Sequence, residues 1–168
     1  GTGAVLQAFG NFENTGTITQ NDGVIEMVDD GNIDTTQTLQ STTALESVRF
    51  DKTAGGSVAV AGTTLTINDF SITSGNTFTF SVPNSQTLVL PNGMSMASAT
   101  FDIAGGGEVQ VGTSQSISVT GGTFSTSGTN DAFPQNTSNK ATITRQAAGR
   151  WGFSATAGSV SLTGFLLD

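Results

Sequence analysis

The segment Gly122-Thr123-Phe124-Ser125 repeats a pattern already present in Asn76-Thr77-Phe78-Thr79 and Ala99-Thr100-Phe101-Asp102, and Gly149-Arg150-Trp151-Gly152 repeats it once more. The four aromatic residues lie 23, 23 and 27 positions apart. Self-similarity at a period of about 20–30 residues indicates a repeat architecture, in which neighbouring repeats bury one continuous core. The pattern therefore predicts a core ladder with one aromatic rung per coil, made of Phe78, Phe101, Phe124 and Trp151.

Short triplets that alternate apolar and polar residues fill the rest of the chain, as in Val109-Gln110-Val111 and Ile117-Ser118-Val119. Glycine, asparagine and serine separate them, and no window has the apolar spacing of a helix. We predict three short strands and three bends per coil, in a right-handed parallel β-helix of about 23 residues per coil and roughly seven coils. An antiparallel β-sandwich is the alternative, although it does not account for a tetrad that recurs at a fixed period.

The composition fits a β-solenoid, which buries only a narrow core inside each coil. Only 35% of the 168 residues are hydrophobic, below the usual ~45–50%, yet 11 Phe argue against disorder. The chain has no Cys and no His, so disulfides, thiolate metal sites and a histidine base are excluded. The net charge of −8 argues against nucleic acid and anionic lipid as partners, and no apolar run is long enough to insert into a membrane.

Charge is distributed unevenly along the chain. Residues 1–48 contain seven acidic residues and no Lys or Arg, whereas residues 132–167 contain Lys140, Arg145 and Arg150 and no acidic residue. The ends of a β-helix leave strand edges unpaired, and neither 1–12 nor 159–168 has the pattern of a capping helix. We expect 1–168 to be a single solenoid segment of a longer repeat protein, whose partners are neighbouring coils or further copies of itself.

The coil between Phe124 and Trp151 is longer than the others. We expect residues 125–139 to form a loop inserted at one corner, because this stretch is polar and contains Pro134. Insertions on one face of a solenoid often carry recognition, so Asn130, Asp131, Phe133 and Asn136 are candidates for contacting cell-surface glycans. A tolerated surface insertion is the other interpretation of the same stretch.

Candidate metal chemistry is confined to Asp30, Asn32 and Asp34, which alternate oxygen ligands as in the first half of a calcium loop. The glycine and the distal glutamate of such a loop are missing at the expected places, and an acidic, solvated turn is the alternative interpretation. Calcium is the one cofactor that the sequence suggests.

Catalysis is not expected. Glycoside hydrolysis needs two carboxylates within about 10 Å of each other, which on a β-helix means outward acidic residues on adjacent coils. The expected ladder neighbours of Asp102 are Thr79 and Ser125, and Glu108 is expected beside Thr87. None of these neighbours is acidic, so we expect the chain not to be an enzyme.

Several stretches, including residues 14–24, 37–52 and 56–67, share an Asn-x-Gly-x-hydrophobic character. In this they resemble the coils of bacterial surface and secreted β-strand-repeat proteins of the adhesin and autotransporter-passenger type. The resemblance implies an extracellular or cell-surface, non-catalytic structural or adhesive module, acting as a stiff rod or an assembly unit. The alternative is a carbohydrate-binding or carbohydrate-cleaving β-helix, including the phage tail-spike type.

Overall fold

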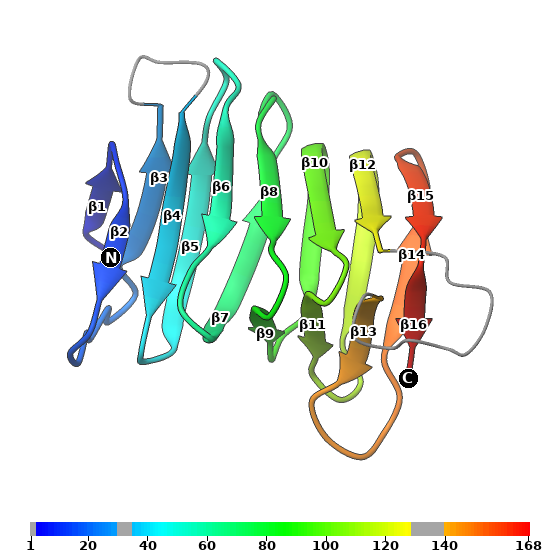
Figure 1. The fold of residues 1–168 in the computed structure, drawn as a ribbon. Coiled ribbons are helices and arrows are strands. Elements are labelled where there is room, and N and C mark those ends of the chain that lie inside the picture. The colour runs from blue at the N-terminus through cyan, green and yellow to red at the C-terminus, as the bar shows by residue number, and fades with distance from the viewer. Residues whose placement is uncertain (1–2, 30–34, 129–139) are drawn as a thin grey trace.

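The computed structural model describes residues 3–29, 35–128 and 140–168. These residues form sixteen strands that belong to one sheet, and every strand pair among them is parallel. The strands wind through about six turns stacked along one axis, with the first and last coils at opposite ends (Figure 1). The fold is therefore the predicted all-β parallel solenoid, with close to the predicted number of coils.

No helix occurs in the described part of the chain, so none there could span a membrane.

The coils have three faces. The first face contains β1 (Val5–Ala8), β3 (Val24–Val28), β5 (Leu45–Asp51), the C-terminal part of β7 (Thr64–Ile72), the N-terminal parts of β10 (Met94–Ala104) and β12 (Ser116–Ser127), and β14 (Gly152–Ala155). The second face contains β2 (Phe12–Asn14), β4 (Thr36–Ser41), β6 (Ser57–Val60), β8 (Thr79–Val82), the C-terminal parts of β10 and β12, and β15 (Ser159–Thr163). The third face contains the N-terminal part of β7, β9 (Thr87–Leu90), β11 (Glu108–Val111), β13 (Ala141–Arg145) and β16 (Phe165–Leu167).

Alternation along each strand places one residue in the core and the next in solvent, as β11 illustrates with Val109 and Val111 fully buried and Glu108 and Gln110 at the surface. Because all coils run in parallel, equivalent inward residues form columns along the axis. We call one of them the first-face column, and its members in chain order are Leu6, Ile25, Val48, Phe70, Met94, Ile117 and Phe153.

Aromatic rings fill the middle of the solenoid. The ring of Phe101 stacks on that of Phe80 with centroids 5.3 Å apart, and on that of Phe124 at 5.4 Å with an interplanar angle of 5°. The ring of Phe70, from the first face, lies nearly perpendicular to those of Phe80 and Phe101, with centroids 5.0 and 5.8 Å away. Stacked and edge-to-face pairs at these distances add to the free energy gained from burial alone.

The predicted ladder is right at Phe101 and Phe124 and wrong at its other two rungs. Phe101 pairs with Phe80, not with Phe78. The coil from β8 to β10 is two residues shorter than the tetrads suggest, because the bends between strands differ in length. Phe78 instead lies just before β8, fully buried and stacked on Phe50 with centroids 5.2 Å apart.

Trp151 is not a rung of this ladder, because the residue paired with Phe124 in the next coil is Val160. Trp151 lies just before β14, half-buried, and its indole Nε1 donates a hydrogen bond of 3.0 Å to the backbone oxygen of Asp168. The ladder step from Phe124 to Val160 spans 36 residues. The tetrad at Trp151 therefore resembles the others in sequence, but it lies at the start of a first-face strand, whereas Phe101 and Phe124 lie on second-face strands.

The loop predicted over residues 125–139 begins later than expected. Residues 125–127 are not loop but the last part of β12, where Ser125 pairs with Ser161 and Ser127 with Thr163. The strand continues because Phe124 and Thr126 both point into the core. Residues 129–139 lie outside the described part of the chain.

Sharp bends depend on glycine where consecutive coils nearly touch. Gly93 follows β9 with φ at +76°, and a Cβ placed there would lie 2.3 Å from the backbone oxygen of Ser116 in the next coil. Only glycine combines this left-handed backbone with so close an approach.

Candidate functional surfaces

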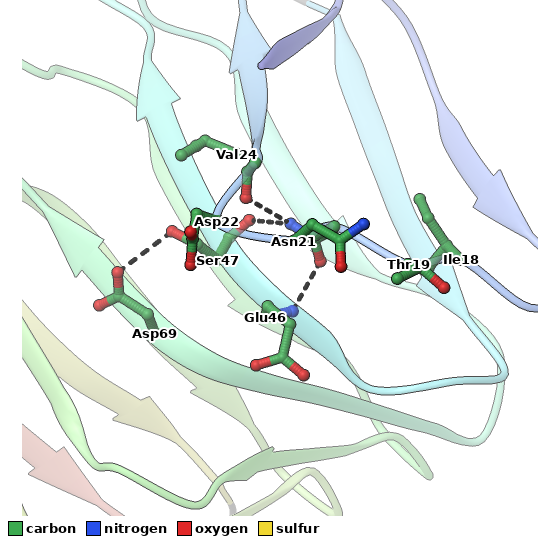
Figure 2. A pocket seen from close by; sticks show the side chains of 10 residues that line it. Ile18, Thr19, Asn21, Asp22, Val24, Glu46, Ser47 and Asp69 are labelled. Atoms are coloured by element: carbon green, nitrogen blue, oxygen red, sulfur yellow. Dashed lines mark hydrogen bonds between the residues drawn. The ribbon is translucent and has the colours of Figure 1, made fainter. Parts of the chain in front are cut away.

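A groove of about 800 Å³ runs along the corner where the third face meets the first (Figure 2). Three successive coils build it, and most of its lining is polar. The lining residues are Ile18, Thr19, Gln20, Asn21, Asp22, Gly23, Val24, Glu46, Ser47 and Asp69. We call this the corner groove.

Three carboxylates line the corner groove, one from each coil: Asp22, Glu46 and Asp69. All three residues are exposed. Neighbouring side chains donate to two of them, since the Asn68 amide binds Glu46 Oε2 at 3.0 Å and the Ser47 hydroxyl binds Asp69 Oδ2 at 3.1 Å. These bonds fix both carboxylates as hydrogen-bond acceptors at the rim of the groove.

The three acidic residues of the corner groove come from successive coils and are not among the candidates named from the sequence. Asp22, Glu46 and Asp69 are 24 and 23 positions apart in the sequence, which is the period of the fold. Applying that period to the acidic residues, as well as to the aromatic ones, would have found them. The regular apolar triplets do not reveal them, because Asp22 lies in a bend and Glu46 and Asp69 lie next to the corner between the third and first faces.

Gln20 connects the wall of the corner groove to the next coil through two hydrogen bonds. Its side-chain amide donates to the backbone oxygen of Ser47 at 2.9 Å, and its Oε1 accepts from the backbone N–H of Glu46 at 2.6 Å. The bend that follows contains two non-glycine residues with positive φ, Asn21 at 45° and Asp22 at 66°. Asn and Asp tolerate this conformation better than other residues, so the bend that presents Asp22 is fixed by its sequence.

Carboxylate, amide and hydroxyl groups on one wall suit a ligand rich in hydroxyls, because they offer both acceptors and donors. None of the described residues that line the corner groove is aromatic, so they offer no platform on which a sugar ring could stack. Among the described residues, no group of three or more Asp, Glu, His or Cys side chains is placed to hold a metal ion.

The predicted calcium ligands Asp30, Asn32 and Asp34 lie outside the described residues, as do the predicted recognition residues Asn130, Asp131, Phe133 and Asn136. Both remain predictions.

Asp102 and Glu108, the two acidic residues whose neighbours the sequence predicts, have mostly the expected neighbours. Glu108 pairs with Thr87 as predicted, and Asp102 pairs with Ser125 as predicted. On its other side Asp102 pairs with Ser81, not with Thr79, because of the register difference at β8. The hydroxyls of Ser125 and Ser127 donate to its two carboxylate oxygens at 2.6 and 3.1 Å.

The second face presents small hydroxyl side chains to solvent. One outward column, here called the hydroxyl column, contains a serine or threonine at every coil it crosses: Thr36, Ser57, Thr79, Thr100, Thr123 and Ser159. Short β-branched and hydroxyl side chains pack well on a pleated surface, and they leave this face even and uncharged along that line.

Two ion pairs connect adjacent coils near the N-terminal end. Arg49 contacts Glu26 at 2.6 Å, and the amide of Gln7 donates to the other oxygen of Glu26 at 2.9 Å. The hydrogen bond from Gln7 lowers the pKa of Glu26, burial opposes it, and Arg49 lowers the pKa further, so the carboxyl ends below its ordinary value of 4.5. This chain of contacts ties β1, β3 and β5 together across the outer surface of the first face.

The second pair is more deeply placed. Lys52 has only 1% of its side chain exposed, and its Nζ lies 3.3 Å from Asp29 Oδ1. The other oxygen of Asp29 accepts from the backbone N–H groups of Thr53 and Ala54 at 2.9 and 3.0 Å. Burial raises the pKa of Asp29, but these backbone bonds together with Lys52 outweigh it, so the pKa falls below its ordinary value of 3.8.

Comparison with protein-family models, with curated proteins and with solved structures found no match to this chain.

Proposed function

We propose that this chain is a non-catalytic structural module that acts as a stiff spacer. The observation that carries the proposal is the unbroken set of inward columns. Each internal member of the first-face column is at most 5% exposed, from Ile25 in the second coil to Ile117 near the end. Bending the rod would open a gap in these columns, and close-packed interiors resist such gaps. A rod of this kind holds apart whatever is joined to its two ends.

The proposed setting is the surface of a bacterial cell or the extracellular medium, in a protein of the adhesin or autotransporter-passenger type. The low hydrophobic content and the hydroxyl-rich second face support it. Adhesion itself would then depend on surfaces that the rod displays.

Spin labels can test the stiffness directly, because the chain has no cysteine of its own. Thr36 and Ser159 belong to the hydroxyl column, are both exposed, and lie five strand steps apart, or about 24 Å at ~4.8 Å per step. We expect a double cysteine variant to give one narrow distance distribution in double electron–electron resonance.

The matched control moves the label at Thr36 by one coil, to Ser57, and keeps the label at Ser159. The mean distance should then shorten by about 4.8 Å with no change in width. A broad distribution in both variants would mean that the coils do not form a stiff rod.

Carbohydrate binding is the second candidate function, and the corner groove favours it because acids, amides and hydroxyls converge there. In this alternative the substrate is a polysaccharide, and Glu46 and Asp69 accept hydrogen bonds from its hydroxyls. Losing one charged acceptor costs about 1.5–3 kcal/mol. Asp69→Asn should therefore weaken binding to a neutral or cationic glycan about tenfold or more in isothermal titration.

The control for that experiment is Asp102→Asn, which removes an outward acid elsewhere and should leave the affinity unchanged. Release of reducing ends from the bound glycan would extend the candidate from binding to cleavage. If no glycan from a broad panel binds the unmodified chain, this candidate fails.

A further inference from the structure

The two ends of the solenoid expose apolar side chains that its middle buries. At the N-terminal end these residues are Val5, Leu6 and Phe9, and at the C-terminal end they are Phe153, Val160, Phe165, Leu166 and Leu167. The strands that carry them are edge strands: among the described strands, β1 pairs only with β3, and β14 pairs only with β12. An unpaired edge with apolar side chains is a template for another strand.

The two ends are complementary in register. Leu6 and Phe153 are the first and last members of the first-face column, and they are 53% and 39% exposed. Two positions further along the same strands, Ala8 and Ala155 also point inward, since they pair with the fully buried Met27 and Val119. A second copy placed with its β1 against β14 would set Leu6 on Phe153 and Ala8 on Ala155, and both columns would continue unbroken.

Strand direction favours the same arrangement. A copy displaced along the axis keeps every strand parallel to its neighbour, as in the rest of the sheet. Joining two N-terminal ends, or two C-terminal ends, would reverse one copy and make the strands at the joint antiparallel, with a different hydrogen-bond pattern.

The two ends of the solenoid differ in charge. Residues 3–23 carry Glu13 and Asp22 and no cation. At the other end Arg145 and Arg150 are exposed. Arg145 donates a hydrogen bond of 3.3 Å to the backbone oxygen of Gly149 and lies 3.7 Å from Asp168, and this exposed ion pair is too solvated to stabilise much. Opposite potentials attract unlike ends and disfavour contact between like ends.

We propose that a second copy of this chain stacks head to tail on the first, with β1 of one copy extending the first face beyond β14 of the other. The proposal deepens the structural role argued above and rests on it. Because the two contacting surfaces differ, each joint leaves a free end on both sides, and repetition gives an open filament.

One-ended variants test this geometry in the analytical ultracentrifuge. At roughly 100 µM, the unmodified chain should show a weight-average mass of at least about twice the 17.0 kDa monomer. Leu6→Lys blocks the N-terminal end and Phe153→Lys blocks the C-terminal end, so each variant alone should be monomeric. Mixed in equal amounts, they should form one-to-one dimers and nothing larger, because each supplies the end that the other lacks.

The rings of Phe153 and Phe124 form a T-shaped pair with centroids 5.2 Å apart, so replacing Phe153 also removes a ring contact of the last coil. Leu167→Lys is the substitute, because Leu167 is 51% exposed at the same end. Ser95→Lys, on an exposed outward position of β10, is the matched control and should associate like the unmodified chain. Raising the salt from about 0.05 to 1 M should weaken association, because it screens the opposite charges.

A chain that stays monomeric at all concentrations would overturn the stacking proposal. So would dimers of Phe153→Lys alone, since they would show that two N-terminal ends join. Neither result would affect the stiff-spacer proposal, which the spin-label distances test on the isolated chain.

Discussion

Replacing Phe101 by alanine should lower the free energy of unfolding by about 3–5 kcal/mol, the range for deleting a buried aromatic ring. The ring is fully buried and lies between those of Phe80 and Phe124, with the ring of Phe70 nearly perpendicular to it at 5.8 Å. Three rings lose their partner at once, and the coils on either side hold the backbone apart, so the cavity cannot easily collapse. Urea unfolding followed by far-ultraviolet circular dichroism measures the change over all coils.

Phe9→Ala is the matched control, because it removes the same ring from a residue that is 60% exposed. We expect that variant to stay within about 0.5 kcal/mol of the unmodified chain. The fluorescence of the single tryptophan, Trp151, reports on the last coils alone. If the solenoid unfolds in parts, the fluorescence and dichroism transitions of Phe101→Ala will separate. Equal stabilities for the two alanine variants would contradict a central aromatic stack.

The fold could be predicted from sequence because the inward triplets repeat wherever a strand lies, whatever happens between them. The register could not be predicted, because the bends between strands differ in length. A longer or shorter bend changes the spacing in the sequence without changing the column that the next strand joins. Phe78 and Phe80 are both inward and fully buried, so the sequence alone does not say which of them continues to Phe101. The length of the bend decides it, and similarity of the surrounding tetrad does not.

The candidate surfaces divide in the same way. The corner groove was predictable in principle, because its acids follow the coil period. Lys52 was not. In the sequence it follows Val48-Arg49-Phe50-Asp51 and reads as an exposed residue at the end of a strand. It becomes buried because the chain turns there, and the backbone N–H groups of the next two residues, Thr53 and Ala54, both donate to Asp29.

Replacing Asp29 by asparagine should cost about 3 kcal/mol at pH 7, near the lower limit for removing one partner of a buried ion pair. The substitution keeps one oxygen as the acceptor for Thr53 and Ala54, and it replaces the charged oxygen that faces Lys52 by a neutral NH2 group. Lys52 is then left as a buried cation without the carboxylate that faces it in the unmodified chain. The cost stays at the lower limit because the Asp29 side chain is 24% exposed and water can reach it.

The double variant Asp29→Asn with Lys52→Met separates this electrostatic cause from loss of packing. Methionine keeps much of the buried lysine stem and removes the charge, and replacing a whole buried pair by apolar groups is often nearly neutral. We therefore expect the double variant to be more stable than Asp29→Asn alone. An additive result, with no recovery, would show that the charge on Lys52 does not cause the loss.

Acid provides an independent check on the same pair. The pKa of Asp29 is lower in the folded chain than its ordinary value of 3.8, so its stabilising effect is fully present above about pH 3.8 and disappears as the pH falls through the lowered value. Below that range the unmodified chain and Asp29→Asn both present a neutral group to Lys52. The gap between their free energies of unfolding, measured by urea from pH 7 downward, should therefore narrow only below about pH 3.8. A gap that stays constant through that range would mean that the charge of Asp29 does not cause the difference in stability.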